Sequence, residues 1–553
     1  MNNNLYNINI KGIPGEVKQA TDNRVYNWQK LKYGMFIHWG IYSQIGGVWN
    51  NAAATEGYSE QIQMWENISK DEYLKEAESF VAKEFDPKLI CQLAKESGMK
   101  YIVLTTKHHD GFCMFDTETT DYNIVEQTPF GKDALYLLAK ECQKQGLKLG
   151  IYYSLVDWSQ GHSFDPYNSN PISTSIENLI KEQLKELLMN YGSIVELWFD
   201  MGSPTLEQSE KIVSLVRKYQ PETMINSRIW NNVGDFRTLS DNELPDSEMS
   251  GAWQTPASIN HDTWGYRSWQ EYDVFFNRLN SLLSELIKVC ANGGNYLLNI
   301  GPRGDGTLVE YEVDALRAVG EWIKRHPEIV NGNKTTKFPV QSWGHVMVND
   351  RNLFLYLTNI PSNNKIVLSG LATPALQVIE DNFDTYLTWE QDNYELSINL
   401  PPNLEESFIP VLKVKLSDDL YVIPEKVVFP NSKIWSISNE DISYSYSYVD
   451  SGNYFSTELS TVKLEAFIAT RKKQELLLEF HGEVDLNSDY NIRVGNQEKV
   501  ISGKQLQEEK IGFFSVSASE IIPLVITLAN PRYKGENINM NVNRIVVSIK
   551  NDV

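Results

Sequence analysis

The chain has 553 residues, and its 50 Lys and Arg against 72 Asp and Glu give a formal net charge of −22. Because phosphate groups attract clustered Lys and Arg, this acidic balance argues against nucleic acid or an anionic membrane surface as a partner. The sequence has no run of about 18 apolar residues, which argues against a transmembrane helix. Apolar residues make up 42% of the chain, enough for the cores of about two to four domains.

The start of the chain and its cysteines bear on its compartment. The first residues read MNNNLYNINIKG, without the charged start and apolar stretch of a secretory signal. This predicts a cytoplasmic protein, or a secreted one if a leader has been removed. The four cysteines form no C-x-x-C pair and fit a reducing compartment, with core packing as their expected role.

Strand-like apolar runs alternate with helix-like segments over residues 1–335. Predicted strands cover 33–40, 101–106, 149–155, 195–200, 223–227 and 296–300, and predicted helices cover 86–98, 133–146, 174–190, 270–289 and 309–325. Continuous apolar strands separated by amphipathic helices indicate a parallel sheet covered by helices. The favoured fold class is α/β with a (β/α)8-like barrel, and an open doubly wound sheet is the alternative.

The pattern changes after the predicted barrel. Segments such as NLFLYLTNI, YELSINL and VLKVKL alternate polar and apolar residues with a period of two. We expect a β-sandwich over residues 336–418 and a second β-sandwich over 419–553, with carbohydrate binding as the candidate role of the second.

Polar residues gather where the predicted strands end. In chain order these are His38 and Trp39, Lys107, His108 and His109, Tyr152 and Tyr153, Asp200 and Arg228. In a β/α barrel the carboxyl ends of the strands converge on one mouth, where active sites are found. A zinc site at the histidines is the competing interpretation, but their spacing matches no common ligand pattern, so we expect no metal and no cofactor.

Aromatic residues and carboxylates point to a carbohydrate cleft. Of the 14 Trp residues, 12 precede residue 344, and several flank the polar strand ends, where they could stack on sugar rings. Retaining glycoside hydrolysis needs two carboxyl groups, a nucleophile and an acid/base. Asp200 directly follows a buried strand and is the natural nucleophile. Glu243 and Glu248, in the segment DNELPDSEMSGAWQ, are the candidate partners.

These residues lie in motifs that resemble the α-L-fucosidases of glycoside hydrolase family 29. The motifs are KYGMFIHWG, GYSE, FDPKLICQLAKESGMKYIVLTTKHHDGF, TPFGKDALYLLAKECQKQGLKLGIYYSLVDW, ELWFDMG, INSR, TWGY and NGGNYLLNIGPRGDGTL. They occur in family order from Trp28 to Leu308, about half of the chain.

The resemblance implies a retaining exo-α-L-fucosidase that acts on terminal fucosyl linkages of oligosaccharides or glycoconjugates. Asp200 of ELWFDMG matches the family nucleophile. The positions that hold the fucose hydroxyls or order the nucleophile are matched by His38, Glu60, His108, His109, Tyr153 and Arg228. Trp198 and Trp264 match aromatic residues of the pocket wall. Trp39, next to His38 in FIHWG, is a further candidate for contact with the sugar. An apolar wall would favour the methyl group of fucose over the hydroxymethyl group of galactose.

One departure from the family pattern affects the acid/base. Where many members carry Trp-Glu before TWGY, this chain has Trp253-Gln254, and an amide cannot act as a general acid. Some members supply the acid/base from an earlier loop, at a similar distance along the chain from the nucleophile. Glu243 lies 43 residues after Asp200, which fits that distance, and it is preferred over Glu248. The alternatives are a fucose-binding protein with impaired catalysis, or the same mechanism on a related sugar such as α-L-galactose.

Overall fold

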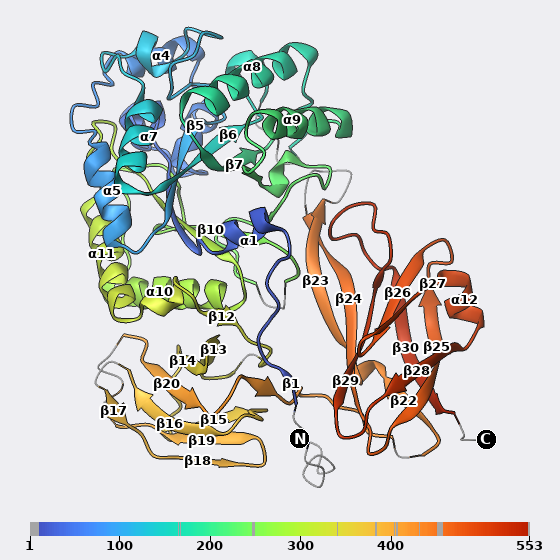
Figure 1. Ribbon diagram of the computed structural model, residues 1–553. Helices are drawn as coiled ribbons and strands as arrows, with labels where there is room; N and C mark the ends of the chain where they lie inside the picture. The colour runs from blue at the N-terminus through green and yellow to red at the C-terminus, as the bar shows by residue number, and fades with distance from the viewer. Residues whose placement is uncertain are drawn as a thin grey trace.

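The computed structural model describes residues 10, 12–163, 165, 168–245, 249–339, 341–381, 384–402, 404, 408–430, 432–450 and 457–550. Eight strands form one sheet in the first part of the chain: β2 (Tyr33–Ile37), β5 (Tyr101–Lys107), β6 (Lys148–Ser154), β7 (Ile194–Asp200), β8 (Met224–Ile225), β9 (Arg237–Thr238), β10 (Trp253–Ser258) and β11 (Asn295–Ile300). Their order is β8-β7-β6-β5-β2-β11-β10-β9, and all neighbours are parallel (Figure 1).

The two edge strands of this sheet, β8 and β9, come close to each other. Asn226 and Phe236, which adjoin them, form a parallel bridge. The backbone N–H groups of Asp235 and Phe236 also point to the carbonyl of Ile225, at 2.7 and 3.3 Å. The sheet therefore curls almost into a closed barrel, which confirms the predicted (β/α)8-like architecture.

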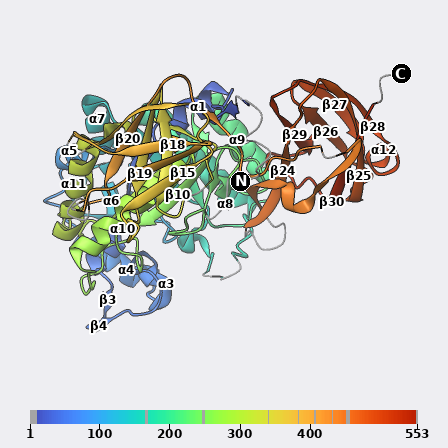
Figure 2. The same cartoon turned by 90° about the horizontal axis from the view of Figure 1, so that it is seen from below.

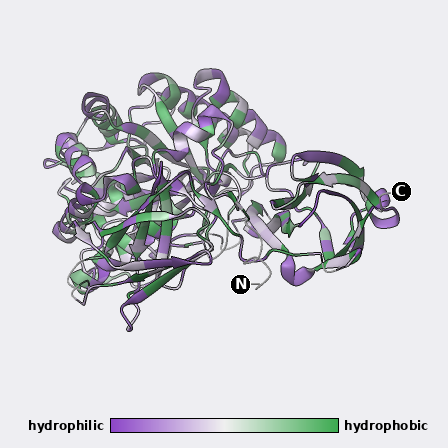
Figure 3. Ribbon diagram, turned by 60° about the horizontal axis from the view of Figure 1, so that its bottom comes forward, coloured by the Kyte–Doolittle hydropathy of each residue, from purple (hydrophilic) through white to green (hydrophobic). Residues whose placement is uncertain are grey.

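Helices cover the outer face of the curled sheet (Figure 1). The longer ones are α5 (Pro87–Glu96), α7 (Ala134–Gln145), α8 (Thr174–Asn190), α9 (Leu206–Tyr219), α10 (Phe275–Ala291) and α11 (Glu310–Arg325), with short helices α1 (Asn23–Gln29), α2 (Ile41–Ile45), α3 (Ile62–Trp65), α4 (Lys70–Ala77) and α6 (Ile124–Gln127). Asp86, Asp133, Ser173 and Thr205 cap the first turns of α5, α7, α8 and α9. The outer helices show alternating hydrophilic and hydrophobic bands in Figure 3, as amphipathic helices do. Among the described residues, no helix combines the length and the apolar character that a membrane crossing requires.

The predicted strands and helices of the barrel are confirmed, with small differences at their ends. The helix α9 and the strands β9 and β10 are not among the predicted elements. β9 has two residues, and β10 reads WQTPAS, in which Gln254 and Pro256 hide the apolar run of a buried strand. Gln254 is accommodated in β10, which lies between two neighbouring strands, because its side chain is hydrogen-bonded inside the barrel.

Aromatic rings fill the inside of the barrel. The cluster includes Trp28, Phe36, Tyr101, Tyr152 and Trp198, all nearly inaccessible to solvent. Tyr101 crosses the interior over Gly34 of β2, where a Cβ atom would lie 2.4 Å from the ring. Glycine at position 34 thus makes room for an aromatic floor beneath the strand ends.

A group of antiparallel sheets follows the barrel, which we call the middle sheets. One sheet has the order β12-β13-β14-β20-β16-β17 and the other β15-β19-β18. Their strands are β12 (Lys334–Thr335), β13 (Gly344–Asn349), β14 (Asn352–Leu357), β15 (Lys365–Ser369), β16 (Ala375–Glu380), β17 (Thr385–Tyr386), β18 (Trp389–Asp392), β19 (Glu395–Asn399) and β20 (Val411–Leu416). The start of the chain joins this part, because β1 (Ile13–Pro14) pairs with β21 (Tyr421–Val422).

The last strands form two further antiparallel sheets around a separate apolar core, here called the C-terminal sandwich. Their orders are β22-β30-β25-β28 and β23-β24-β29-β26-β27. The strands are β22 (Ile434–Ser438), β23 (Ser443–Asp450), β24 (Thr457–Ala469), β25 (Gln474–Val484), β26 (Asp489–Val494), β27 (Gln497–Ser502), β28 (Ile511–Val516), β29 (Ile521–Leu528) and β30 (Met540–Ile549), with helix α12 (Gly503–Glu508). The C-terminal sandwich stands beside the barrel, with β23 and β24 toward it (Figures 1 and 2).

The contact between Gly34 and Tyr101 leads to a prediction about stability. In Gly34→Ala the new methyl group meets the Tyr101 ring, so we expect the free energy of unfolding to fall by about 1–3 kcal/mol. Chemical denaturation monitored by tryptophan fluorescence measures this loss. Gly34→Ser should lose at least as much, and an unchanged midpoint in both variants would contradict the close packing.

Candidate active site

Side chains from four neighbouring strands meet at the carboxyl end of the curled sheet. His38 follows β2, His108 and His109 follow β5, Tyr152 lies near the end of β6, and Asp200 ends β7. The ring of Tyr152 lies 5.7 Å from that of His38 and 5.4 Å from that of His108, between centroids. The structure thus brings His38, His108, His109 and Asp200 together, as the strand ends predict.

Asp200 is a buried carboxylate with partners on both oxygens. Arg228 donates a hydrogen bond of 2.8 Å to Oδ1, and the hydroxyl of Tyr152 donates one of 2.8 Å to Oδ2. Nε2 of His109 lies 3.8 Å from Oδ2. Burial raises the pKa of Asp200, but the effects of Arg228, His109 and the hydrogen bonds lower it by more than burial raises it. The pKa of Asp200 is therefore below its usual value. Asp200 is therefore ionised at neutral pH, as a carboxylate nucleophile must be.

Arg228 bridges two carboxylates. Its Nη1 binds Asp200, while Nη2 donates to Oδ1 of Asp241 over 3.0 Å. The guanidinium lies 4.8 Å above the ring centroid of Trp198. Burial lowers the pKa of Arg228, but the two carboxylates raise it above its ordinary value, so the charge is permanent. Arg228 thereby connects the end of β7 with the loop between β9 and β10.

The three histidines of the cluster are neutral. Burial lowers the pKa of His38 to about 3, that of His109 to about 4 and that of His108 well below its usual value. Nδ1 of His38 is 2.7 Å from Oδ1 of Asn299, and Nδ1 of His109 is 2.6 Å from Oγ of Ser154. Nδ1 of His108 has no hydrogen-bond partner among the described residues. A neutral imidazole offers one donor and one acceptor, which suits the hydroxyl groups of a sugar.

Glu60 and Trp264 lie on one side of this cluster. Oε2 of Glu60 accepts hydrogen bonds from the backbone N–H groups of Trp264 and Gly265, at 3.2 and 2.8 Å. Burial raises the pKa of Glu60 to about 7. The ring of Trp264 lies 5.3 Å from that of His38 and 6.0 Å from that of Phe36, between centroids. These rings give the site an apolar wall next to its polar groups.

Trp198 and Gln254 belong to the floor of the site. The indole N–H of Trp198 donates to Oε1 of Gln254 over 2.8 Å. The amide of Gln254 in turn donates to the hydroxyl of Tyr101 over 3.0 Å and to Glu196 over 3.1 Å, and Trp28 donates to Glu196 over 2.5 Å. Because Gln254 is fully buried in this network, its amide does not stand in for an acid in the cleft.

The structure corrects the expectation for Tyr153. Its hydroxyl donates to Oε1 of Gln183 in α8 over 2.6 Å, and the Lys107 ammonium lies 4.4 Å from its ring centroid. Successive side chains of a strand point to opposite faces, so one tyrosine of the pair in IYYS faces the barrel interior and the other faces the helices. Tyr152 is the inward one, and it is the tyrosine that contacts Asp200.

Trp39 is also placed away from the cluster. Its indole N–H donates to the carbonyl of Arg303 over 2.9 Å, and its ring stacks on Phe85 at 4.5 Å between centroids. It is fully buried against Phe80 as well. These contacts make Trp39 part of the packing beside the site rather than of the site wall.

Glu243 is half-buried in the loop between β9 and β10. Its Oε2 accepts from the backbone N–H of Ser240 over 2.9 Å, and its Oε1 accepts from the hydroxyl of Tyr448 over 2.5 Å. It follows Asp241, the second partner of the guanidinium, by two residues. Glu248, the second choice for the acid/base, lies outside the described residues.

Asp241 and Tyr448 are the site residues that reasoning from the sequence missed, and Tyr152 was recognised at a strand end while the site role was given to its neighbour Tyr153. Asp241 stands in SDNELP, two positions before Glu243. The segment YSYSY, 444–448, carries the signal for Tyr448, because three tyrosines recur with the period of a strand.

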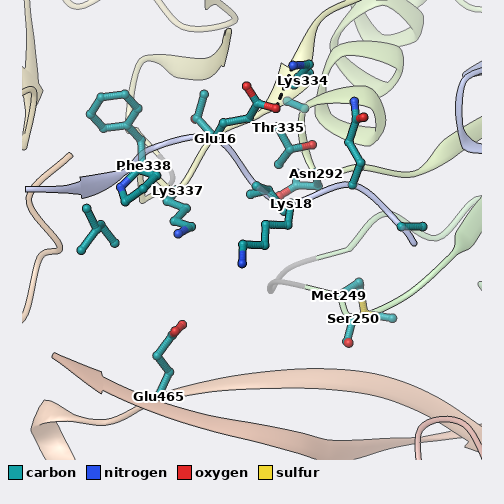
Figure 4. Close-up of a pocket in the computed structure, with 18 of the residues that line it drawn as sticks. Glu16, Lys18, Met249, Ser250, Asn292, Lys334, Thr335, Lys337, Phe338 and Glu465 are labelled. Carbon is teal, nitrogen blue, oxygen red and sulfur yellow. Dashed lines mark ion pairs between the residues drawn. The ribbon is translucent and has the colours of Figure 1, made fainter. Parts of the chain in front are cut away.

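A cleft lies at the other end of the barrel. It has a volume of about 1870 Å³ and reaches Lys32, Trp253 and Gly293, which lie at the amino ends of β2, β10 and β11. Figure 4 shows an ion pair between Glu16 and Lys334 on one wall and Glu465 of the C-terminal sandwich opposite. Because active sites of β/α barrels lie at the carboxyl ends of the strands, we assign the function to the Asp200 cluster instead.

Potential metal ligands also gather away from Asp200. Among the described residues, His326, Glu328 and Asp381 form a group whose ligand atoms lie within 4.8 Å of one another. Nδ1 of His326 is 3.2 Å from Oδ2 of Asp381, and Tyr356 donates to Glu328 over 3.3 Å. These contacts tie the end of α11 to the middle sheets.

Comparison with known proteins identifies a family. The model of the family described as Alpha-L-fucosidase matches residues 11–328. Tissue alpha-L-fucosidase of Mus musculus is 27% identical over 418 residues, spanning 71% of this chain and 91% of that protein. The Dictyostelium discoideum alpha-L-fucosidase is 26% identical, spanning 62% of this chain and 79% of that protein.

Solved structures resemble the chain over different lengths. Alpha-L-fucosidase isoenzyme 1 from Paenibacillus thiaminolyticus is 27% identical with a TM-score of 0.63, covering 72% of this chain and 99% of its own. The Thermotoga maritima alpha-fucosidase, solved in complex with a mechanism-based inhibitor, is 28% identical with a TM-score of 0.60, covering 70% and 96%. The alpha-L-fucosidase from Vibrio sp. strain EJY3 is 22% identical with a TM-score of 0.67 and covers 96% and 98%, so its fold extends over the C-terminal sandwich as well.

The buried carboxyl of Glu196 yields a prediction about pH. Burial raises its pKa from 4.5 to about 7 in the folded protein. Its contribution to stability is therefore fully present below pH 4.5 and is lost as pH rises through 7. In Glu196→Gln this loss disappears, so from pH 4.5 to 8 the variant should gain up to about 3 kcal/mol in unfolding free energy relative to the wild type. Denaturation at a series of pH values measures it, and parallel pH curves would contradict the raised pKa.

Proposed function

The chain belongs to the α-L-fucosidase family of glycoside hydrolases, and on that premise we propose that it releases terminal α-L-fucose from oligosaccharides by a retaining double displacement. The observation that carries the proposal is the environment of Asp200, an ionised, buried carboxylate held by Arg228 and Tyr152 among neutral histidines. A fixed anion of this kind is what nucleophilic attack on an anomeric carbon requires.

In the first step a carboxylate oxygen of Asp200 attacks the anomeric carbon. The new ester bond forms as the bond to the leaving oxygen breaks, and the protonated carboxyl of Glu243 gives its proton to that oxygen. Support for Glu243 is its place on the loop whose Asp241 shares the guanidinium of Arg228 with Asp200. The aglycone then departs as a neutral alcohol.

In the second step water takes the place of the aglycone. Glu243, now ionised, accepts a proton from the water as the oxygen attacks the anomeric carbon, and Asp200 leaves as a carboxylate. The hydrogen bonds from Arg228 and Tyr152 stabilise the negative charge that returns to Asp200. Two inversions at one carbon give fucose with its original α configuration.

Recognition of the sugar is assigned to the groups around Asp200. His38, His108 and His109 are neutral and present ring nitrogens, and Glu60 adds a carboxyl group beside them. Such groups suit the three hydroxyls of fucose, and the rings of Trp264 and Phe36 suit its methyl group.

The double displacement predicts the product and the effect of removing the nucleophile. Proton NMR of a reaction on fucosylated oligosaccharides should show α-L-fucose first. Asp200→Gly should lower kcat by about 10⁴-fold, because the covalent route is gone. Added azide should restore turnover of an aryl fucoside by entering the vacated space and giving β-L-fucosyl azide. Appearance of β-fucose first in the wild type would exclude retention.

The role of Glu243 predicts a dependence on the leaving group. Glu243→Gln should lower kcat/KM on a fucosyl oligosaccharide by about 100-fold or more, since its leaving oxygen needs a proton. On 2,4-dinitrophenyl fucoside, whose leaving group needs no acid, bond cleavage should change little, and slow hydrolysis of the intermediate should give a burst. Asp241→Asn serves as the comparison, because its effect should not depend on the leaving group. Equal losses of Glu243→Gln on both substrates would remove Glu243 from the acid/base role.

A further inference from the structure

Strand β23 of the C-terminal sandwich presents a row of tyrosines. Tyr444, Tyr446 and Tyr448 alternate along β23 with small or apolar residues that are buried in the sandwich. All three tyrosines are half-buried. Tyr444 packs against the sandwich core, whereas Tyr448 packs against the core of the barrel. In Figure 1 this strand is the part of the C-terminal sandwich that stands next to the barrel.

β23 is fastened to the segment of the barrel that carries Glu243. The backbone N–H of Asn232 donates to the Asp450 carboxylate over 2.6 Å, and the N–H of Asp450 donates to the Asn232 side chain over 3.0 Å. Arg237 lies 3.8 Å from the same carboxylate. The backbone N–H of Ser250 donates to the carbonyl of Tyr446 over 2.8 Å. The docked strand thus binds residues that precede Glu243 and residues that follow it in the sequence.

Tyr448 reaches the carboxyl group of Glu243 from this docked strand. Its hydroxyl donates to Oε1 over 2.5 Å. Its ring packs against the apolar core of the barrel, as the side chains of Val233 and Leu244 also do. The backbone N–H of Ser240 binds the other oxygen at 2.9 Å. Each oxygen of Glu243 therefore has one donor, and one of the two comes from the C-terminal sandwich.

We propose that Tyr448 is a positioning residue for the acid/base Glu243, so that the C-terminal sandwich completes the active site. The inference rests on the role proposed above for Glu243. Tyr448 acts through the carboxyl group and is not assigned a contact with the sugar.

The chemistry of the two steps explains what such a residue contributes. A glutamate in a surface loop samples several rotamers, and proton transfer needs one of them within hydrogen-bond reach of the leaving oxygen. A donor on each oxygen restricts the carboxyl group to one orientation. The phenol also stabilises the ionised carboxylate, the form that accepts a proton from water in the second step. Without Tyr448, the backbone N–H of Ser240 still holds one oxygen of Glu243, and the other oxygen loses its hydrogen bond from the phenol.

The test compares Tyr448→Phe with Tyr446→Phe, which removes a hydroxyl from the same face of the same strand and keeps the backbone contact to Ser250. On a fucosyl oligosaccharide we expect Tyr448→Phe to lower kcat by about tenfold with little change in KM. On 2,4-dinitrophenyl fucoside cleavage should change less than twofold or so, because no acid is needed. Tyr446→Phe should match the wild type on both substrates.

A double variant separates positioning from direct binding of the aglycone. In a Glu243→Gln background, Tyr448→Phe should cause no further loss on the oligosaccharide, because the group through which it acts is already disabled. A loss that persists in this background, or one confined to KM, would overturn the positioning role. Asp450→Asn, which weakens the docking of β23, should reproduce the dependence on the leaving group and provides a second variant if Tyr448→Phe is poorly folded.

Failure of this inference can be told from failure of the proposed function. If Glu243→Gln shows the leaving-group dependence and Tyr448→Phe behaves as the wild type, Tyr448 has no positioning role and Glu243 keeps its own. If Glu243→Gln has no effect on the oligosaccharide, the acid/base assignment fails, and the inference about Tyr448 falls with it.

Discussion

The ion pairs of the half-buried Arg228 with Asp200 and Asp241 are the contacts on which the rest of the site depends. A carboxylate removed from water tends to take up a proton, and burial alone would raise the pKa of Asp200. The opposing charge of Arg228 reverses this tendency and keeps Asp200 ionised. The same guanidinium holds the loop between β9 and β10, so the charge that preserves the nucleophile also orders the segment that carries Glu243.

The groups around that ion pair are polar but uncharged. Burial lowers the pKa of His38, His108 and His109, so these side chains are uncharged at neutral pH. They retain donors and acceptors for sugar hydroxyls. Beneath them, aromatic rings and the hydrogen-bonded network of Gln254 fill the barrel and hold the strand ends in place. One charge pair in a firm, otherwise neutral pocket is a suitable setting for chemistry at an anomeric carbon.

A continuous series of contacts runs from the barrel into the C-terminal sandwich. It passes from Asp200 through Arg228 to Asp241, along the loop past Asn242 to Glu243, and from there to Tyr448. The contacts of Asp450 with Asn232 and Arg237 fix the docked strand at the same place. The cleft lined by Lys32, Trp253 and Gly293 lies at the other end of the barrel, at the amino ends of the strands. The C-terminal sandwich is therefore a structural part of the site and not merely an appended module.

Local patterns in the sequence determined most of the longer helices, most strands of the barrel and the position of Asp200, because each depends on residues a few positions apart. The two-residue strand β9 and the polar strand β10 escaped this reasoning, since their burial is set by neighbouring strands. The choice between Tyr152 and Tyr153 depends on which face of β6 turns inward, which the curl of the whole sheet decides. The contact of Tyr448 with Glu243 joins residues 205 positions apart. Only the tertiary structure could decide it, because the docking of one folded unit on another leaves no periodic trace in either segment.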